Sequence, residues 1–504
     1  MLNTPLERTL AGWWGRVDDA SKKGFLAAIC VSVLAFGWEM TNLTLHHDDV
    51  IQIFIQDTIL GHYLGRFGLG WLHYYTQNGY FMPFLQMTEG ILLMSAYGVV
   101  VARFWGAHKA TDIALIAAIL CVFPYMAHLY QYNTAMSTYP LAHLLVALAL
   151  VFSTRATFVG VAIAATLYVA AFSIYQAVAA NAATIFVIWL LSRFLFGGTD
   201  ARMASRATVR ATVAVLVAAV AGGIIYLAAV STMHLEPDTI HASDDAFHLR
   251  DAMDLRLALP IIFNGTRSFF VWPEHYYPQY LKGLQLAFIA AAGLFCLVVP
   301  AKLWAKIAAP TLLVVAAFAP RLLQFLHPEG HFHSVALTAY AVFVAGAVMI
   351  VVRAGGILTR NVSLIIAGLL IGGYVLQCNW ISTVSYLNTL AHFETLTQVL
   401  ARLRAVPDGN WDGKKIAVVG RYEMPTEYPF MASDGVATKF MDAKHMGYMA
   451  QLIRDEANFV AADQTMPKVL EYARTHTPWP DPRSVAVIDG VGVVVFANKP
   501  ADAP

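Results

Sequence analysis

The sequence contains little charge. Only 13% of its 504 residues are Asp, Glu, Lys or Arg, whereas 58% are apolar. This number of charged side chains is too small to cover the surface of soluble domains of this size. We therefore expect the chain to lie in a lipid bilayer. The 33 basic and 32 acidic residues nearly cancel and form no basic stripe or acidic tail. We therefore expect no nucleic-acid partner.

Cysteine is scarce too, and the common motifs of nucleotide and hydrolase sites are absent. The four cysteines lie in separate apolar runs without a CxxC or Cys/His spacing, and we interpret them as small buried residues: Cys30, Cys121, Cys296 and Cys378. The sequence has no P-loop, no Rossmann fingerprint attached to a strand, no GxSxG and no HExxH. Nucleotide hydrolysis therefore has no support.

Long apolar runs dominate what is present. Because unsatisfied backbone groups are costly in lipid, each run of about twenty residues is predicted to be a membrane-spanning helix. The first run lacks a cleavage site of small residues, and we expect it to stay as an anchor. We predict an all-α polytopic membrane protein of about eleven spans, at residues 24–43, 80–102, 112–129, 138–154, 157–173, 176–196, 209–231, 284–301, 304–320, 334–352 and 361–385.

Basic residues predict the orientation of these spans, because short cytoplasmic loops retain Lys and Arg. Here they fall on alternate sides of the spans, at Arg8, Arg16, Lys22, Lys23, Arg103, Lys109, Arg155, Arg193, Arg202, Arg206, Arg210, Lys302, Lys306, Arg353 and Arg360. We therefore predict a cytoplasmic N-terminal segment, 1–23. The segments 233–283 and 321–333, and everything after about residue 386, are predicted to face outward.

The composition changes after the last span, where charged residues return. Residues 415–420 and 484–488 are typical of short buried strands, and 466–475 has helical spacing. Asp489-Gly490, followed by the apolar run 491–497, predicts a hairpin turn. We therefore expect a transmembrane domain at 24–385 and a small outward α/β domain at 386–504.

The acidic pair Asp48/Asp49 follows the first span directly, after His46-His47. One interpretation is a solvated interfacial loop, or an N-cap for a helix that begins near Val50, because Asp is a favoured cap and complements the helix dipole. The alternative is catalytic: one carboxylate takes a proton from an attacking hydroxyl, and the second orients it or a metal. The position after the first span favours the catalytic interpretation.

The next segment, 61–68, combines glycines with Arg66 and is followed by Trp71 and other aromatic residues. Glycines let backbones approach closely, and an arginine near lipid headgroups can bind phosphate through its planar guanidinium. An ordinary interfacial arginine in an aromatic belt has the same composition. Phosphate binding by Arg66 is therefore one of two open interpretations.

Other candidates lie in or near the spans and in the outward loops. Glu39 and Glu89 are ionisable groups at apolar runs, which usually face a bundle interior or a wet cavity. The loop 321–333 holds Arg321 and His331, which could donate to a phosphate or, with neighbouring histidines, bind a divalent metal. The loop 233–283 predicts an interfacial amphipathic helix, and Trp272 beyond it could stack on a sugar ring.

Several features together resemble the bacterial O-antigen glucosyltransferases of the serotype-converting type (glucosyl transferase II), a GT-C family. They are the acidic pair, the stretch 61–66, the polar and aromatic loop 130–139, the segment Ser173-Ile174-Tyr175-Gln176-Ala177 and the outward C-terminal domain. The resemblance covers most of the chain. It implies a multispanning enzyme of the bacterial inner membrane that uses a polyprenyl-phosphate sugar donor and a glycan acceptor.

The resemblance also implies roles for individual residues. Asp48 or Asp49 would be the catalytic base. Arg66, Arg321 and His331 would hold the donor phosphate. The expected substrate-binding residues are His47, Glu39, Tyr139, Gln176 and Trp272. No cofactor is predicted from a motif, and a divalent cation is left open.

The predicted function is transfer of a hexose, glucose first, to an O-antigen or other cell-surface glycan at the periplasmic face. A GT-C enzyme that moves arabinose, mannose or an amino sugar is the nearest alternative, because the scaffold does not separate these. The competing class is a transporter or flippase of a lipid-linked sugar. Transporters usually bind near the bilayer midplane and often contain repeated halves, whereas the candidate residues here gather at the outer ends of the spans.

Overall fold

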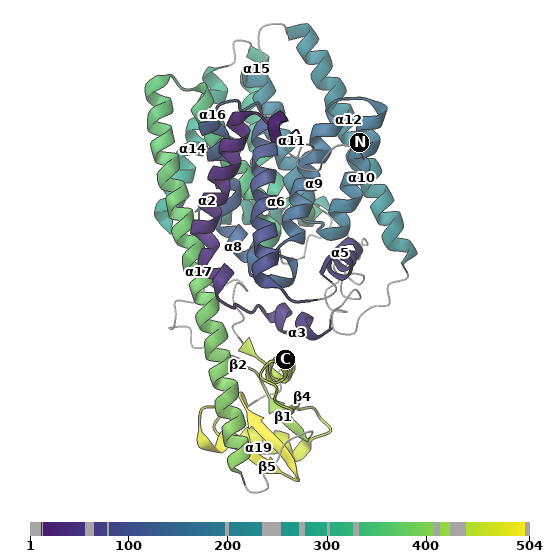
Figure 1. The fold of residues 1–504 in the computed structure, drawn as a ribbon, viewed down its shortest axis with the longest axis vertical. Coiled ribbons are helices and arrows are strands. Elements are labelled where there is room, and N and C mark those ends of the chain that lie inside the picture. The colour runs from purple at the N-terminus through teal and green to yellow at the C-terminus, as the bar shows by residue number, and fades with distance from the viewer. Residues whose placement is uncertain are drawn as a thin grey trace. The chain divides into compact units, whose positions relative to one another are not determined.

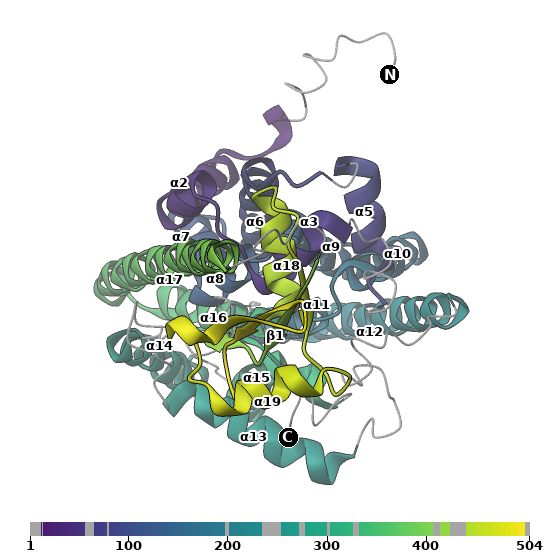
Figure 2. The ribbon, with the colours of Figure 1, turned by 90° about the horizontal axis from the view of Figure 1, so that it is seen from below.

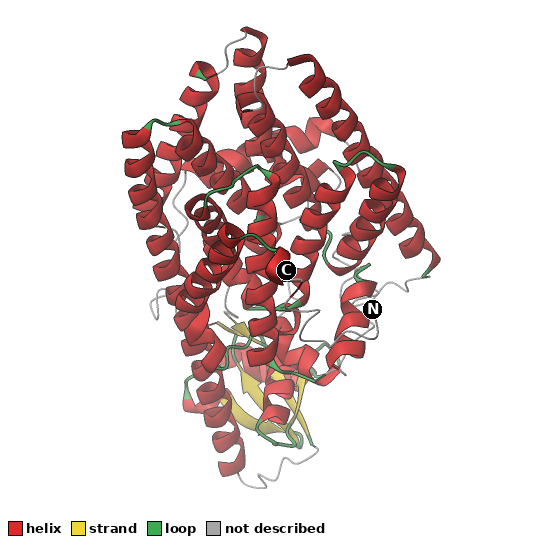
Figure 3. Cartoon of the chain, turned by 45° about the horizontal axis from the view of Figure 1, so that its top comes forward, coloured by secondary structure: helices red, strands yellow, loops and turns green. Residues whose placement is uncertain are grey.

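The computed structural model of the protein describes residues 12, 14–55, 65–77, 80–196, 201–233, 254–271, 278–299, 303–325, 332–406, 414–423 and 440–498. In this part of the chain helices predominate, and every strand follows residue 414 (Figure 3). Contacts divide the chain into two compact units. Unit 1 comprises residues 1–40, 57–130 and 135–380, and unit 2 comprises residues 41–56, 131–134 and 381–504.

Each of the eleven predicted spans overlaps a helix, or for 112–129 the pair α7/α8 (Figure 1). The helices and 3-10 helices from α2 to α17, apart from α3, are α2 (Asp19–Thr41), α5 (Phe67–Gln77), α6 (Pro83–Phe104), α7 (Ala110–Val122), α8 (Pro124–Tyr130), η1 (Asn133–Ala135), α9 (Thr138–Ser153), α10 (Phe158–Ile174), α11 (Val178–Phe196), α12 (Ala201–Thr232), α13 (Leu255–Val271), α14 (Gln279–Val298), α15 (Leu303–Phe318), η3 (Ala319–Phe325), η4 (Ser334–Leu337), α16 (Ala339–Ala354) and α17 (Ile357–Ala405). Among the described residues, nine helical segments are long and apolar enough to cross a membrane, and α7/α8 adds a tenth as one broken span. The remaining predicted span is the shorter α10, of 17 residues. The prediction of a helical polytopic membrane protein is confirmed.

The break between α7 and α8 bends this span by 54°. Pro124 is the first residue of α8, and proline removes a backbone donor and disfavours the helical conformation of the residue before it. The bend turns α8 toward η4, where His128 Nδ1 and Ser334 Oγ form a hydrogen bond. The apolar runs thus fold into spans that are not all straight.

Polar contacts tie the loops of unit 1 at one end of the bundle. Arg360, in the first turn of α17, forms an ion pair with Asp112 in the first turn of α7. Arg353 Nη1 donates to the Trp105 carbonyl at 2.7 Å. Both loops were predicted to lie on the cytoplasmic side, and they lie together. Which side of the membrane they face stays a prediction.

The segment 233–283 contains α13, where the sequence predicts an amphipathic helix. Its buried residues recur at helical spacing: Ala258, Ile262, Thr266 and Phe269. The residues of this segment at 234–253 and 272–277 lie outside the described part of the chain. One face of α13 therefore packs into unit 1.

Unit 2 contains a small α/β fold. Its helices are α3 (His47–Ile55), α18 (Ala443–Leu452) and α19 (Pro467–Thr475), with a short η5 (Pro482–Ser484), and its strands are β1 (Lys415–Val419), β2 (Tyr422–Glu423), β3 (Phe440–Met441), β4 (Asn458–Ala461), β5 (Val485–Ile488) and β6 (Val491–Val495). The main sheet has the order β4-β1-β6-β5, and β2 pairs with β3 separately. β1 is parallel to β4 and β6, whereas β5 and β6 form an antiparallel hairpin. The C-terminal strand region predicted from the sequence is present.

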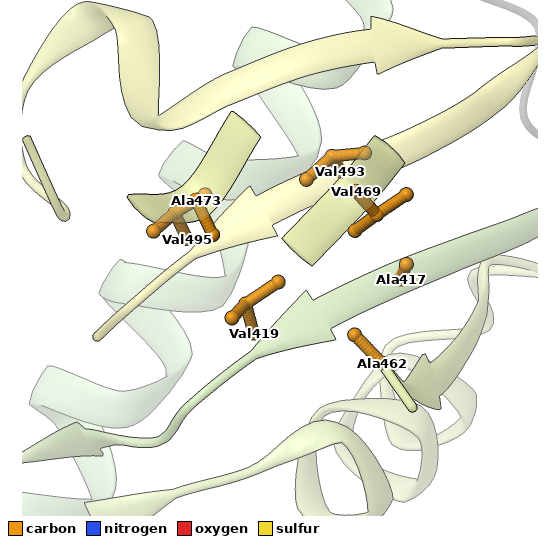
Figure 4. Packing of buried hydrophobic residues seen from close by; sticks show 7 residues of the cluster. All are labelled: Ala417, Val419, Ala462, Val469, Ala473, Val493 and Val495. Atoms are coloured by element: carbon orange, nitrogen blue, oxygen red, sulfur yellow. The ribbon is translucent and has the colours of Figure 1, made fainter. Parts of the chain in front are cut away.

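The core of this fold lies between the sheet and α19. Val469 and Ala473 of α19 pack on β1 and β6, among the buried residues Ala417, Val419, Ala462, Val493 and Val495 (Figure 4). In Figure 2, α18 and α19 lie on opposite sides of the strands. Four of the five residues of β1 are buried, as expected for a strand covered on both faces.

The helix of the acidic pair, α3, belongs to unit 2. Phe54 of α3 stacks on Tyr448 of α18, with ring centroids 5.8 Å apart. The Leu45 backbone N–H donates to Thr389 Oγ1, on α17, at 3.0 Å. Unit 2 therefore joins the loop after the first span to the C-terminal fold. The predicted boundaries 1–23, 24–385 and 386–504 stay a prediction.

Candidate functional site

Three of the predicted site residues, Arg66, Tyr139 and Gln176, lie in contact in unit 1. Arg66 Nη1 donates to the Tyr139 hydroxyl at 3.0 Å, and Arg66 Nε donates to Gln176 Oε1 at 3.2 Å. The half-buried guanidinium also lies over the rings of Tyr139 and Tyr175. These two rings stack with centroids 4.1 Å apart. We call Arg66, Tyr139, Tyr175, Gln176 and Tyr226 the Arg66 cluster.

The glycines around Arg66 permit this close packing. Gly65 has a φ of +67°, which favours glycine, and a Cβ there would lie 2.8 Å from the Tyr226 hydroxyl. That hydroxyl donates to the Gly65 carbonyl at 3.2 Å and accepts from Gln176 Nε2 at 2.9 Å. A Cβ at Gly68 would collide with Ser173 Oγ. The prediction that these glycines allow close backbone approach fits both positions.

Asp49 is the centre of a second cluster, in unit 2. Its carboxylate is fully buried and accepts four hydrogen bonds. Asn133 Nδ2 donates at 2.8 Å, the His46 backbone N–H at 3.0 Å, and the Thr134 N–H and hydroxyl at 3.3 and 3.4 Å. The rings of His46 and Tyr132 are in contact at a tilt of 38°, with centroids 4.1 Å apart. The loop 131–134 and the start of α3 are therefore held together through Asp49.

The bond from the His46 N–H gives Asp49 a structural role at the start of α3. His46 precedes the first helical residue, and a side chain three positions later that bonds back to its N–H forms half of a capping box. Burial raises the pKa of the Asp49 carboxyl above its ordinary value, although the charge of His46 and the Asn133 hydrogen bond oppose that shift. Asp49 therefore stabilises the start of the helix, but α3 begins at His47 and not near Val50, so Asp49 lies in the first turn and is not the predicted N-cap.

A third cluster surrounds Arg321, in η3 of unit 1. Arg321 Nε donates to the Tyr340 hydroxyl at 3.1 Å, and Nη1 donates to Gln324 Oε1 at 3.2 Å. Tyr340 stacks on Phe269 with centroids 3.8 Å apart. The guanidinium lies against Gly265 of α13, where a Cβ would be 2.7 Å from Arg321 Nε. We call Arg321, Gln324, Tyr340, Phe269 and Gly265 the Arg321 cluster.

Comparison with known sequences identifies the family of this chain. A sequence model of the family described as glucosyl transferase GtrII matches residues 37–352, which is more than half of the chain. The chain belongs to the glucosyl transferase GtrII family. A search of curated proteins found no match. The suspected resemblance is confirmed, and the protein is a membrane glycosyltransferase that acts on a cell-surface glycan.

The match to the GtrII family includes all three clusters, but their residues belong to different units. Arg66 and Arg321 lie in unit 1, and the acidic pair lies in unit 2. Arg66 bonds to Tyr139 and Gln176, whereas Arg321 bonds to Tyr340 and Gln324. The phosphate-binding residues that were predicted as one group therefore lie in two clusters.

The remaining predicted site residues of this GtrII chain lie only partly within the described part of the chain. Glu39 is buried near the end of α2, as expected, whereas Glu89 is exposed on α6, against the expectation. The side chains of His47 and Asp48 lie outside the described part of the chain, as do Trp272 and His331. The predicted roles of these residues stay predictions.

The structure adds buried polar residues of the GtrII chain that sequence reasoning did not single out. Asn133 bridges Asp49 and the Thr44 carbonyl, and Lys282, which is buried, donates to the Phe269 carbonyl at 2.8 Å. His143 and Asn181 are fully buried within predicted spans. A polar residue in an apolar run was the available signal for these last two, because such residues usually face a bundle interior.

A metal site was left open by the sequence. Within the ranges that the structure describes, no group of three or more His, Cys, Asp or Glu side chains is placed to bind a metal ion. The histidine-rich part of the loop 321–333 lies partly outside those ranges. A divalent cation stays a prediction.

Proposed function

We propose that this GtrII-family enzyme moves a hexose, glucose first, from a polyprenyl-phosphate donor to an O-antigen or other cell-surface glycan at the periplasmic face of the inner membrane. The observation that carries the proposal is the Arg66 cluster. A half-buried guanidinium among tyrosines combines a cation for a phosphate with aromatic rings for a sugar. Membership of the GtrII family supports glycosyl transfer to a cell-surface glycan. The polyprenyl-phosphate donor is our own proposal.

Arg66 and Arg321 are proposed to bind the donor phosphate, together with His331. In the described part of the chain, Arg321 Nη2 donates to no protein group, so its N–H groups can point to a ligand. Positive groups there stabilise the phosphate as negative charge develops on its bridging oxygen. Tyr139 and Gln176, with His47, Glu39 and Trp272, are proposed to contact the substrates.

The proposed reaction is a single displacement at the anomeric carbon. An acceptor hydroxyl oxygen attacks that carbon, and the bond from the carbon to the phosphate oxygen breaks. The polyprenyl phosphate leaves with the bonding electrons, and the hydroxyl proton passes to a carboxylate base. Displacement from the opposite face inverts the anomeric configuration.

We assign the base to Asp48 and a positioning role to Asp49. Asp49 is fully buried, and four donors already occupy its carboxylate. An acceptor hydroxyl would have to displace these donors to reach it. Asp48 is the adjacent acid, so the hydrogen bonds of Asp49 would fix the helix turn that carries Asp48.

The proposed side of the membrane rests on the alternation of basic residues along the spans. By that alternation the N-terminus is cytoplasmic, and the acidic pair and the C-terminal α/β fold are periplasmic. A polyprenyl-phosphate sugar then reaches its site through the bilayer, and the glycan reaches it from the periplasm. The packing of α3 on α18 supports a role of the C-terminal fold next to the acidic pair.

The test is transfer of labelled glucose from synthetic polyprenyl-phosphate-glucose to purified glycan. We expect transfer by the wild type and a loss of about hundredfold or more for Asp48→Asn at unchanged thermal stability. Asp49→Asn should lose activity together with stability, by about 1–3 kcal/mol, because buried donors lose their acceptor. Glu394→Gln, an exposed carboxylate of α17, is the matched control and should retain full activity.

Three outcomes decide between the roles. Full activity of both Asp48→Asn and Asp49→Asn would remove the acidic pair from the mechanism. An inactive but stable Asp49→Asn beside an active Asp48→Asn would reverse the two roles. Absence of transfer by an intact wild type would reject glucose on a polyprenyl phosphate as the donor, and other sugars on the same lipid would be tried next.

A further inference from the structure

Three fully buried polar side chains meet inside unit 1, and the proposed mechanism gives them no role. They are His143 of α9, Asn181 of α11 and Thr338, directly before α16. His143 Nε2 lies 3.1 Å from Thr338 Oγ1, and Asn181 Nδ2 donates to the same oxygen at 2.9 Å. His143 Nδ1 lies 2.8 Å from the Tyr139 carbonyl oxygen. We call His143, Thr338 and Asn181 the buried bridge.

The hydrogen bonds of the buried bridge fit a single arrangement of protons. The Tyr139 carbonyl only accepts, so His143 Nδ1 carries the proton and donates to it. In a neutral ring Nε2 then accepts, and the Thr338 hydroxyl is its donor. The hydroxyl oxygen is left to accept from Asn181. Every bond thus has a defined direction, which fixes the three side chains relative to one another.

Thr338 makes this bond instead of a common local one. It stands at the N-cap of α16, where a threonine hydroxyl usually accepts from the backbone of its own helix. Here its side chain makes no cap hydrogen bond. The hydroxyl instead joins α16 to α9 and α11. We infer that the contact with His143 and Asn181, and not helix capping, is the reason for a threonine at this position.

The two ends of the buried bridge lead to the two arginine clusters. Tyr139, whose carbonyl accepts from His143, also accepts from Arg66 through its hydroxyl. Tyr340, two residues after Thr338, accepts from Arg321 through its hydroxyl. The path from Arg66 to Arg321 therefore runs through α9, the bridge and the first turn of α16.

We propose that the buried bridge is a positioning device that holds the Arg66 and Arg321 clusters at a fixed spacing for one donor phosphate. This inference rests on the proposed function and deepens it. In an apolar bundle a polar side chain has few alternative partners, and leaving it unpaired is costly. The bridge therefore fixes α16 against α9, and the two arginines with them. His143, Thr338 and Asn181 are positioning residues and contact no substrate.

The test compares Thr338→Val with Thr338→Ser in the purified full chain. Valine keeps the shape and removes the hydroxyl, whereas serine keeps the hydroxyl. We expect Thr338→Val to raise the donor KM about three- to tenfold, as the loss of one buried hydrogen bond would, with kcat within about twofold. Thr338→Ser should stay within about twofold of the wild type in both constants.

Thr184→Val is the matched control. Thr184 is also fully buried, on α11, but among the residues that the structure describes its hydroxyl bonds only to the Ala180 carbonyl of its own helix, at 2.8 Å. It should leave the donor KM unchanged. A fall in kcat and thermal stability for Thr338→Val, without a change in donor KM, would make the bridge ordinary helix packing and overturn the proposal.

A double mutant tests whether the bridge acts through the arginines. If it positions Arg66, Thr338→Val should add less than about twofold to the donor KM of Arg66→Ala, because the positioned group is already gone. If the double mutant raised the donor KM by the product of the two single-mutant factors, the proposal would be overturned. An unchanged donor KM in Thr338→Val, with transfer by the wild type intact, would overturn it and leave the proposed function standing.

A binding measurement separates the two proposals if the wild type transfers no glucose. Unlabelled polyprenyl phosphate is then added, and its stabilisation of the protein against heat is compared between the wild type, Arg66→Ala and Thr338→Val. Weaker stabilisation in both variants would support the bridge as the positioning device of an anion site, whichever sugar is moved. Equal stabilisation in all three would overturn it.

Discussion

Arg66 and Arg321 repeat one arrangement in two parts of unit 1. Each is half-buried, and each donates to a tyrosine hydroxyl and to a glutamine side-chain oxygen. The distances agree within 0.1 Å, at 3.0 and 3.2 Å for Arg66 and 3.1 and 3.2 Å for Arg321. The tyrosine hydroxyl and the glutamine oxygen are both uncharged, and together they fix the direction in which each guanidinium points.

The two clusters differ in what surrounds the charge. Arg66 lies over two stacked tyrosine rings, Tyr139 and Tyr175. Arg321 lies against the backbone of Gly265, and its tyrosine stacks on Phe269. Aromatic rings with hydroxyl groups can contact both a phosphate and a sugar, whereas the Arg321 surroundings offer mainly the charge. We therefore expect Arg66 to contribute more to donor use than Arg321.

The largest expected effect is that of Arg66→Ala. It removes the cation that lies over the two tyrosine rings, so donor kcat/KM should fall about tenfold to hundredfold, in the range for charged hydrogen bonds. The acceptor KM should change much less. Steady-state transfer with each substrate varied in turn measures both values, and an unchanged donor KM would contradict the phosphate role of Arg66.

Arg321→Ala should have the next largest effect, about tenfold on donor kcat/KM, the value of one charge-assisted hydrogen bond. Arg321→Lys should recover part of it, because a lysine restores the charge without the planar fork. The same assay measures both variants. A larger loss for Arg321→Ala than for Arg66→Ala would reverse the ranking that the surroundings predict.

Two glycine substitutions separate charge placement from backbone strain. A Cβ at Gly265 would overlap the end of the Arg321 side chain, so Gly265→Ala should displace the guanidinium and lower donor kcat/KM about threefold to tenfold. Gly65→Ala instead strains a backbone with φ +67° and should lower the unfolding free energy by about 1 kcal/mol or more. Gly265→Ala should add little to Arg321→Ala, and additive losses would show that Gly265 acts elsewhere.

The arrangement of spans could be predicted from the sequence because it depends on local composition. Long apolar runs are a property of neighbouring residues. The hairpin at Asp489-Gly490 was predictable for the same reason, since both residues take the positive φ that such turns require. These elements need no knowledge of distant contacts.

The candidate site depends on contacts between distant segments, which periodicity does not reveal. Arg66 meets Tyr139 and Gln176 across sequence separations of 73 and 110 residues. Tyr139 and Gln176 were expected only through the family resemblance. The grouping of α3 with α18, almost four hundred residues later, had no signal in the sequence at all.

The smallest expected effects come from Tyr139→Phe and Tyr340→Phe, each of which removes one hydroxyl acceptor and keeps the ring. Each should lower donor kcat/KM about threefold, the value of one net hydrogen bond. Similar losses in the two variants would indicate that both arginines serve the same phosphate, as the buried bridge between them implies.

Tyr139→Leu, which also removes the aromatic face over which Arg66 lies, should lower donor kcat/KM more than Tyr139→Phe does. If only Tyr139→Phe changed donor use while Tyr340→Phe changed acceptor use, the two arginines would serve different substrates, and their similar geometry would reflect a shared way of holding a guanidinium.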